Sequence, residues 1–167
     1  GLTFGTGSHA TTRLCLTALE RAVHGGERVL DLGCGSGILS IAALTLGAAS
    51  AAAVDIDDKC LTVAYENAAL NGIGRDRYTV LVGDAVSDRA LKAQLGGGYD
   101  IVVANIVADV IIGLAPSVRQ FLKHGGLFLC SGIIDTRADE VADALRHAGW
   151  TIEDTRSGEG WYSYTCR

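Results

Sequence analysis

The sequence contains no methionine, and basic residues are in the minority. Its 14 lysines and arginines are outnumbered by 19 aspartates and glutamates, which gives a net charge of −5 over 167 residues. A nucleic-acid surface normally needs a basic face, so this balance argues against direct nucleic-acid binding and is compatible with a basic protein as partner. Because even an initiator methionine is absent, we expect an excised or processed domain.

Paired cysteine motifs are also missing. The scattered thiols belong to Cys15, Cys34, Cys60, Cys130 and Cys166. They form no C-x-x-C pair, and no histidine stands at metal-ligand spacing. An odd, scattered set is typical of reduced thiols and predicts a cytoplasmic protein without a metal site. The sequence shows no secretory signal, internal repeat or low-complexity linker, and it carries no signal for the oligomeric state.

Charge is absent between Leu32 and Val54, a run of 23 residues that a hydropathy window could take for a membrane span. Glycines and serines interrupt this run, and acidic residues rather than lysines flank it. We therefore predict a turn, a buried helix and a buried strand, and no association with a membrane.

The most informative stretch covers residues 28–37 and reads Arg-Val-Leu-Asp-Leu-Gly-Cys-Gly-Ser-Gly. It predicts a buried strand and a glycine turn, followed by an apolar helix over 38–46. The glycines of the turn are Gly33, Gly35 and Gly37. They lack the Cβ atoms that keep a small molecule off the backbone, although such a turn can also simply join two elements. The dinucleotide fingerprint would need a glycine at Ile38, so a nicotinamide enzyme is disfavoured.

An acidic residue ends the next apolar run, 51–54. Asp55 stands 22 positions after Gly33, where a carboxylate can accept hydrogen bonds from both hydroxyls of a ribose. The alternative is that Asp55 or Asp57 merely caps the following helix. We predict that Asp57 caps and that Asp55 binds.

Two later strands, predicted over 78–82 and 99–104, are also followed by polar residues. Asp84 could bind a ligand or close a turn, and Asn105 could bind a ligand or cap the next helix. Ligands of parallel α/β sheets lie beyond the carboxyl ends of the strands, where the strand order reverses. The residues expected to converge there are Gly33, Asp55, Asp84 and Asn105.

The remaining pattern completes one α/β domain. Ser8, Thr11 or Thr12 is expected to cap a first helix. Further helices are predicted over 57–72, 87–95, 106–123 with a break near Pro116, and 135–147. A fifth strand is predicted over 127–130, and a hairpin over 150–154 and 161–166 with a loop at 157–160.

Five stretches together resemble one known family. Residues 4–12, 31–38 and 54–57, with 103–106 and 129–133, are similar to the catalytic domain of the ribosomal protein L-eleven (L11) methyltransferases. The glycine motif alone marks only the superfamily of S-adenosylmethionine-dependent methyltransferases. The resemblance covers nearly the whole chain and implies the Rossmann-like class I fold. That fold has a seven-stranded, mostly parallel sheet with helices on both faces and an antiparallel C-terminal strand.

The resemblance also implies S-adenosyl-L-methionine as cofactor and a basic protein of the large ribosomal subunit as substrate, methylated on lysine or N-terminal amino groups. Phe4 and Thr12 would close over the cofactor, and Asp84 would face its adenine. The other residues implied to hold it are Gly33, Gly35, Gly37, Asp55 and Asn105. Asn105 would be catalytic by orienting the amine, or would bind the methionine end. His9 could accept a proton or act only as a capping group.

The chain departs from related enzymes in two respects. Asn105 is followed by Ile106-Val-Ala, whereas adenine and glutamine amide methyltransferases carry Pro-Pro and an aromatic residue, so planar nitrogens are disfavoured as acceptors. Family members carry a separate N-terminal domain that docks the substrate, and we expect residues 1–167 to be the methyltransferase domain alone. A methyltransferase acting on a small molecule or RNA, or a non-catalytic cofactor-binding domain, stays open as an alternative.

Overall fold

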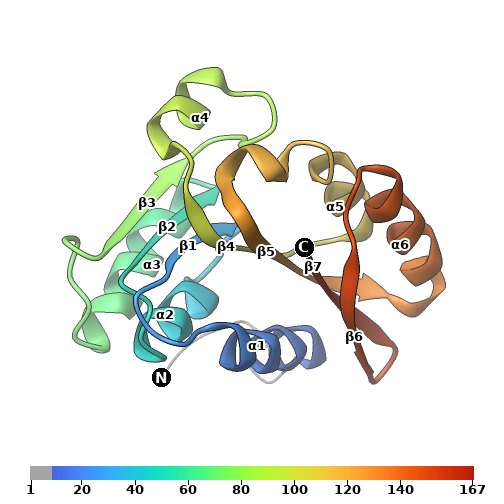
Figure 1. Ribbon diagram of the computed structural model, residues 1–167. Coiled ribbons are helices and arrows are strands. Elements are labelled where there is room, and N and C mark those ends of the chain that lie inside the picture. Colours follow the sequence, from blue (N-terminus) through green and yellow to red (C-terminus); the bar gives the residue numbers. More distant parts are fainter. Residues whose placement is uncertain (1–8) are drawn as a thin grey trace.

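The computed structural model describes residues 9–167, which form a seven-stranded sheet between two layers of helices (Figure 1). The strands are β1 (Arg28–Leu32), β2 (Ser50–Asp55), β3 (Tyr78–Val82), β4 (Tyr99–Asn105), β5 (Leu122–Ile134), β6 (Ile152–Gly158) and β7 (Trp161–Cys166). The α-helices are α1 (Ala10–Ala22), α2 (Ile38–Thr45), α3 (Lys59–Leu70), α4 (Arg89–Leu95), α5 (Ala108–Leu114) and α6 (Ala138–His147). Two short 3-10 helices, η1 (Val118–Phe121) and η2 (Asp135–Arg137), flank β5.

The strand order is β3-β2-β1-β4-β5-β7-β6, and only β7 runs against its neighbours. The predicted class I methyltransferase architecture is therefore confirmed. The chain moves outward from β1 to β3 and then returns to place β4 beside β1. The order reverses between β1 and β4, and a ligand crevice is expected beyond the carboxyl ends of those two strands.

Each face of the sheet is covered by three helices. Figure 1 shows α1, α2 and α3 on one face and α4, α5 and α6 on the other. Strand β4 explains the arrangement, because it is apolar on both sides, as central parallel strands usually are. Val102 and Ala104 belong to the core under α5 and α6, whereas Ile101 and Val103 belong to the core under α1 and α2.

The buried faces of the helices follow the helical spacing of their apolar residues. In α6, Ala138, Val141, Ala142 and Leu145 have this spacing and are all buried. In α1, Cys15, Ala18 and Leu19 are buried as well. Residues spaced by three and four positions lie on one side of a helix, so an apolar set with this spacing has to face the sheet.

The helix predicted over 106–123 appears as α5 and the 3-10 helix η1, separated by a turn at 115–117 as the break near Pro116 predicted, but its predicted end is wrong. After α5 and η1 the chain enters β5 at Leu122, so the predicted strand 127–130 is only the middle of a much longer one. Pairing with β4 jumps from Tyr99↔Leu122 to Ile101↔Leu127, and the residues between form a bulge. Gly125 and Gly126 lie inside this irregular strand rather than ending a helix. Pairing partners decide this, and they lie too far away in sequence to be seen in a local pattern.

The terminal hairpin is confirmed, but its predicted four-residue loop is wrong. Strand β6 continues to Gly158, which leaves Glu159 and Gly160 as a two-residue turn. Both have positive φ, 52° and 83°, as a type I′ turn requires. Such turns match the right-handed twist of the strands they join.

No helix within residues 9–167 is both long and apolar enough to cross a membrane. The uncharged run from Leu32 to Val54 is divided among the end of β1, the glycine turn, α2 and β2, as predicted.

Replacing Gly160 by alanine tests the turn. We expect Gly160→Ala to lower the free energy of unfolding by about 1 kcal/mol, because a Cβ atom disfavours positive φ. The nearest atom to such a Cβ is Asp135 Oδ2 at 3.9 Å, so no steric clash contributes. Denaturant unfolding measures the change, and Gly158→Ala is the matched control, because Gly158 has no positive φ and no atom near its Cβ. Equal effects of the two changes would contradict the assigned turn.

Candidate functional site

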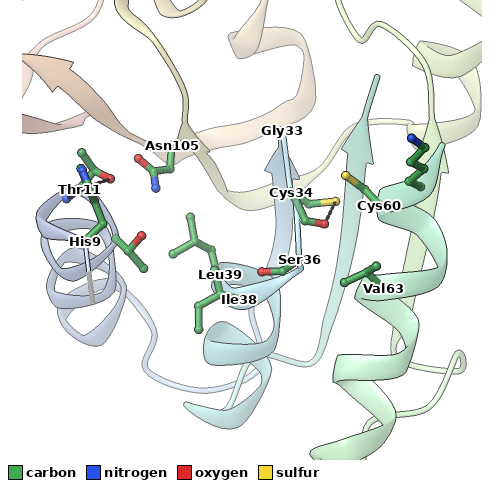
Figure 2. Close-up of a pocket in the computed structure, with 13 residues that line it drawn as sticks. His9, Thr11, Gly33, Cys34, Ser36, Ile38, Leu39, Cys60, Val63 and Asn105 are labelled. Atoms are coloured by element: carbon green, nitrogen blue, oxygen red, sulfur yellow. Dashed lines mark hydrogen bonds between the residues drawn. The ribbon is translucent and has the colours of Figure 1, made fainter. Parts of the chain in front are cut away.

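Two neighbouring cavities lie at the carboxyl edge of the sheet, around the turn that follows β1. The larger, about 540 Å³, is lined by residues from α1, the glycine turn, α2, α3 and the end of β4 (Figure 2). The smaller, about 290 Å³, lies over the ends of β2 and β3. Gly33 and Gly35 line both, so the glycine turn forms their common wall.

Each of the three positions in the turn is occupied by glycine for a different local reason. Gly33 has φ +80°, and a Cβ there would come 2.7 Å from Ile106 Cγ2. Gly35 has φ +52°, and a Cβ there would meet no atom within 4 Å, so a side chain would extend into open space where the two cavities meet. Gly37 lines neither cavity. A Cβ at Gly37 would lie 3.2 Å from Ala64 Cβ, so the missing side chain lets α2 approach α3.

Asp55 joins the end of β2 to the glycine turn. Its Oδ2 accepts a hydrogen bond from the Gly35 N–H (2.9 Å), and its Oδ1 accepts one from the Asp57 N–H (2.9 Å). Each carboxylate oxygen keeps a second lone pair, so Asp55 can still accept bonds from a ligand in the smaller cavity that it lines. Asp58 is the N-cap residue of α3 and makes no side-chain capping bond, but Asp57, the predicted cap, accepts a bond from the N–H of Lys59, the first residue of the helix.

Asp84 also lines the smaller cavity. Its Oδ1 accepts a hydrogen bond from the Val86 N–H (2.8 Å), so it stabilises its own turn while it lines the cavity. The side chain is exposed, which leaves its second oxygen available. Asp84 therefore stabilises a turn, which was one of its two predicted roles, and its contact with a ligand stays a prediction.

Asn105 ends β4 and lines the larger cavity together with Thr11 and Thr12. Figure 2 shows it beside Thr11 at one end of this cavity, with Cys34 and Cys60 at the opposite end. Helix α5 begins after Val107 and has no side-chain cap, so the alternative that Asn105 caps this helix is wrong. The polar edge of the larger cavity thus combines an amide and two threonine residues.

His9, rather than Thr11 or Thr12, caps α1. Its Nδ1 accepts a hydrogen bond from the Thr11 N–H at 3.2 Å, and both threonines lie inside the helix. The ring also packs edge-on against Trp161, with centroids 5.2 Å apart. The capping residue therefore also contacts the terminal hairpin. Two candidates of the sequence analysis, Phe4 and Ser8, lie outside the described residues.

Asp31 has an environment that the motif did not reveal. It is 1% exposed, and its Oδ2 accepts a hydrogen bond from Ser40 Oγ at 2.7 Å. Its Oδ1 has no partner among the described residues. Burial raises the pKa of the Asp31 carboxyl to about 6, although the Ser40 bonds oppose the shift. The one available signal was an acid at an interior position of a strand predicted to be buried.

The two thiols of the larger cavity are poor nucleophiles. Burial, followed by the charges of Asp31 and Asp55, raises the pKa of Cys34 well above its ordinary value. Burial and Asp55 raise the pKa of Cys60 to about 11. Thiols react as thiolates, so both groups stay protonated and unreactive near pH 7. Within residues 9–167 no group of three or more His, Cys, Asp or Glu side chains could hold a metal ion.

This geometry suits a ligand with a nucleoside at one end and a polar tail at the other. Carboxylates that can accept from hydroxyl and amino groups line the smaller cavity, and amide and hydroxyl groups line the larger one. A family model described as ribosomal protein L11 methyltransferase (PrmA) matches residues 1–167. The chain belongs to this family.

Known relatives agree with this assignment. A ribosomal protein L11 methyltransferase from Lachnospira eligens is 43% identical over 170 residues, which cover 100% of this chain and 53% of that protein. This family member therefore spans about half the length of its curated relatives. The crystal structure of the ribosomal protein L11 methylase from Lactobacillus delbrueckii subsp. bulgaricus has a TM-score of 0.87 at 35% identity, covering 96% of this chain and 80% of that chain.

A more distant structure shares the fold alone. Fibrillarin from Aeropyrum pernix, solved with natively bound S-adenosyl-L-methionine, has a TM-score of 0.74 at 17% identity, covering 93% of this chain and 74% of that chain. The family resemblance stated from the sequence is confirmed by the family model and the relatives. None of these comparisons tests the individual site residues, which stay predictions.

The buried carboxylate of Asp31 should make stability depend on pH. Its raised pKa means that the folded state binds this proton more tightly than the unfolded state, so its contribution to stability falls as pH rises from about 4 to 6. Asp31→Asn keeps an acceptor for Ser40 and carries no charge. Relative to this variant, the wild-type chain should lose roughly 3 kcal/mol of unfolding free energy between pH 4 and pH 7.

Denaturant unfolding at several pH values measures this difference. Asp76→Asn, at an exposed position, is the control and should leave the pH dependence unchanged. A wild-type chain that gains stability over Asp31→Asn as pH rises would contradict the assigned environment of Asp31.

Proposed function

We propose that this chain transfers a methyl group from S-adenosyl-L-methionine to amino groups of a large-subunit ribosomal protein. The observation that carries the proposal is the pair of cavities joined at Gly33 and Gly35, with Asp55 bonded to the wall between them. Membership in the ribosomal protein L11 methyltransferase family supports the reaction and the substrate. Because the chain spans about half of its relatives, the activity and the substrate of the whole protein are part of the proposal.

The residues present fit this cofactor. Gly35 leaves room for a ligand along the backbone of the turn, since a side chain there would extend into the cavities, whereas the space beside Gly33 is occupied by Ile106. Asp55 would accept hydrogen bonds from the ribose hydroxyls, and Asp84 would face the adenine amino group. The amino-acid end would then reach the larger cavity, which Thr12 and Asn105 line. The bound S-adenosyl-L-methionine named for the fibrillarin structure is consistent with this use of the fold.

For methyl transfer, the protein mainly has to align the methyl donor with the acceptor amine. The cofactor supplies a methyl group already activated on a sulfonium, so no protein nucleophile is needed, and protonated thiols in the cavity fit that requirement. An acceptor amine with a pKa of about 10.4 must first lose a proton, which costs roughly 4.6 kcal/mol at pH 7. Removal from water beside a positive charge lowers this cost. The Asn105 amide oxygen can accept a hydrogen bond from the neutral amine and orient its lone pair.

The proposed substrate and its docking region follow from the charge and the length of the chain. A net charge of −5 suits a basic ribosomal protein and disfavours direct binding of nucleic acid. We take residues 1–167 as the methyltransferase domain and assign substrate docking to a region of the relatives that this chain does not match. A cytoplasmic location belongs to the same proposal, because both the substrate class and the five free cysteines suit it.

Asp55 is the residue that tests the cofactor site. Asp55→Ala removes two acceptor oxygens, so we expect the dissociation constant of S-adenosylhomocysteine to rise by about ten- to hundredfold. Isothermal titration calorimetry measures it. Asp58→Ala is the matched control, because Asp58 is exposed and makes no side-chain capping bond. Binding of NAD without any response to S-adenosylhomocysteine would overturn the assignment.

The isolated chain should bind cofactor yet methylate the ribosomal protein poorly. We expect transfer of labelled methyl groups to the ribosomal protein L11 substrate at least tenfold slower than with a relative of full length, because the substrate is not held near the site. Robust turnover by residues 1–167 alone would show that docking needs no further region.

A further inference from the structure

Strand β5 contains a second irregularity, beside the end of β4. Its pairing with β7 passes from Cys130↔Tyr164 to Ile133↔Tyr162, so two residues on β5 oppose a single residue on β7. The two are Ser131 and Gly132. Bulges of this kind commonly redirect side chains near functional sites. The parallel register places Ser131 directly opposite Asn105.

Gly132 leaves space for the backbone that follows Asn105. It has φ +86°, and a Cβ there would lie 2.6 Å from the Ile106 carbonyl oxygen and 3.0 Å from the Ile106 nitrogen. The same Cβ would lie 3.1 Å from Asn105 Oδ1. A side chain at position 132 therefore cannot be accommodated unless the end of β4 and the Asn105 amide move.

Ser131 holds two distant parts of the chain at once. Its carbonyl oxygen accepts a hydrogen bond from the Ile106 N–H at 3.1 Å. Its hydroxyl, which is fully buried, donates to the Thr11 carbonyl oxygen at 2.9 Å. One residue thus links the end of β4 to the first turn of α1, and Figure 2 shows Asn105 and Thr11 side by side there.

We propose that Ser131 and Gly132 are positioning residues that set the Asn105 amide and the first turn of α1 at the right separation for the amino-acid end of the cofactor. The inference rests on the proposed function. An amide can donate to a carboxylate and accept from an ammonium group, so its placement decides whether both contacts can form. The glycine turn and Asp55 are held by bonds between β2 and the turn, so the bulge reaches the nucleoside end only through Ile106, which lines the smaller cavity.

Two ligands separate the two ends of the site. S-adenosylhomocysteine has the amino-acid end, whereas 5′-methylthioadenosine has the same nucleoside and thioether without it. We expect Ser131→Ala and Gly132→Ala to weaken the binding of S-adenosylhomocysteine by about tenfold, as measured by calorimetry. Binding of 5′-methylthioadenosine should stay within about twofold of wild type for Ser131→Ala. For Gly132→Ala, whose Cβ also meets Ile106, it should weaken less than binding of S-adenosylhomocysteine. Asn105→Ala should show the same selective loss.

Further variants separate positioning from general damage. Ser131→Cys keeps the volume but lacks a strong donor, so it should behave like Ser131→Ala without leaving a cavity. Ser163→Ala is the matched control, since Ser163 is a buried serine on β7 opposite the bulge, and it should change neither affinity. Thermal unfolding of each variant shows that it is folded.

Several results would overturn the proposal. The positioning role would be contradicted if folded Ser131 and Gly132 variants bound S-adenosylhomocysteine and 5′-methylthioadenosine with the same ratio of affinities as the wild type. The same result for Asn105→Ala would also contradict it. An equal loss for both ligands would indicate a merely structural role and would overturn it as well. Failure of the wild-type chain to bind either nucleoside would instead contradict the proposed function, and the positioning role with it.

Discussion

The hydrogen bond from the Gly35 N–H to the Asp55 carboxylate joins the glycine turn to the end of β2, and the site is arranged around it. The end of β2 makes two more hydrogen bonds to the turn, because the Val54 carbonyl oxygen accepts from the N–H groups of Gly33 (2.8 Å) and Cys34 (3.0 Å). On the other side, the Asn67 amide donates to the Ser36 carbonyl oxygen at 2.9 Å. A turn with positive φ at alternate residues has few internal bonds, so neighbouring elements must supply them.

Beneath this turn the protein keeps a buried acid. A carboxylate removed from water destabilises the fold unless it is well bonded, and within residues 9–167 the Asp31 side chain is bonded to Ser40 alone. The tyrosine hydroxyl of Tyr78 is also buried without a partner among residues 9–167, and a Cβ at Gly37 would come 2.9 Å from it. Such polar groups are rarely favourable for stability alone, and both lie close to the glycine turn.

The opposite end of the site is built from elements that are far apart in the sequence. The first turn of α1, the end of β4 and the bulge of β5 meet through buried Ser131. The terminal hairpin reaches the same region through the contact of Trp161 with His9. The bond that holds the wall between the cavities spans 20 positions, from Gly35 to Asp55, whereas the bond that holds the Asn105 edge of the larger cavity spans 120, from Thr11 to Ser131.

The sequence by itself determined the α/β alternation, the buried helix faces and the polar residues at strand ends. Parallel strands place all their carboxyl ends at one edge, so residues such as Asp55, Asp84 and Asn105 could be brought to one region without coordinates. Helical periodicity likewise reports burial directly, because it depends only on local geometry.

Only the tertiary structure decided where β5 begins, which residue caps α1 and how the strand ends divide between two cavities. The start of β5 depends on its pairing with Tyr99, and the capping residue His9 contacts Trp161, which lies 152 positions later in the chain. Register and long-range contacts involve partners that no local pattern contains. For the same reason the link from Ser131 to Thr11, which joins β5 to α1, became visible only once the chain was folded.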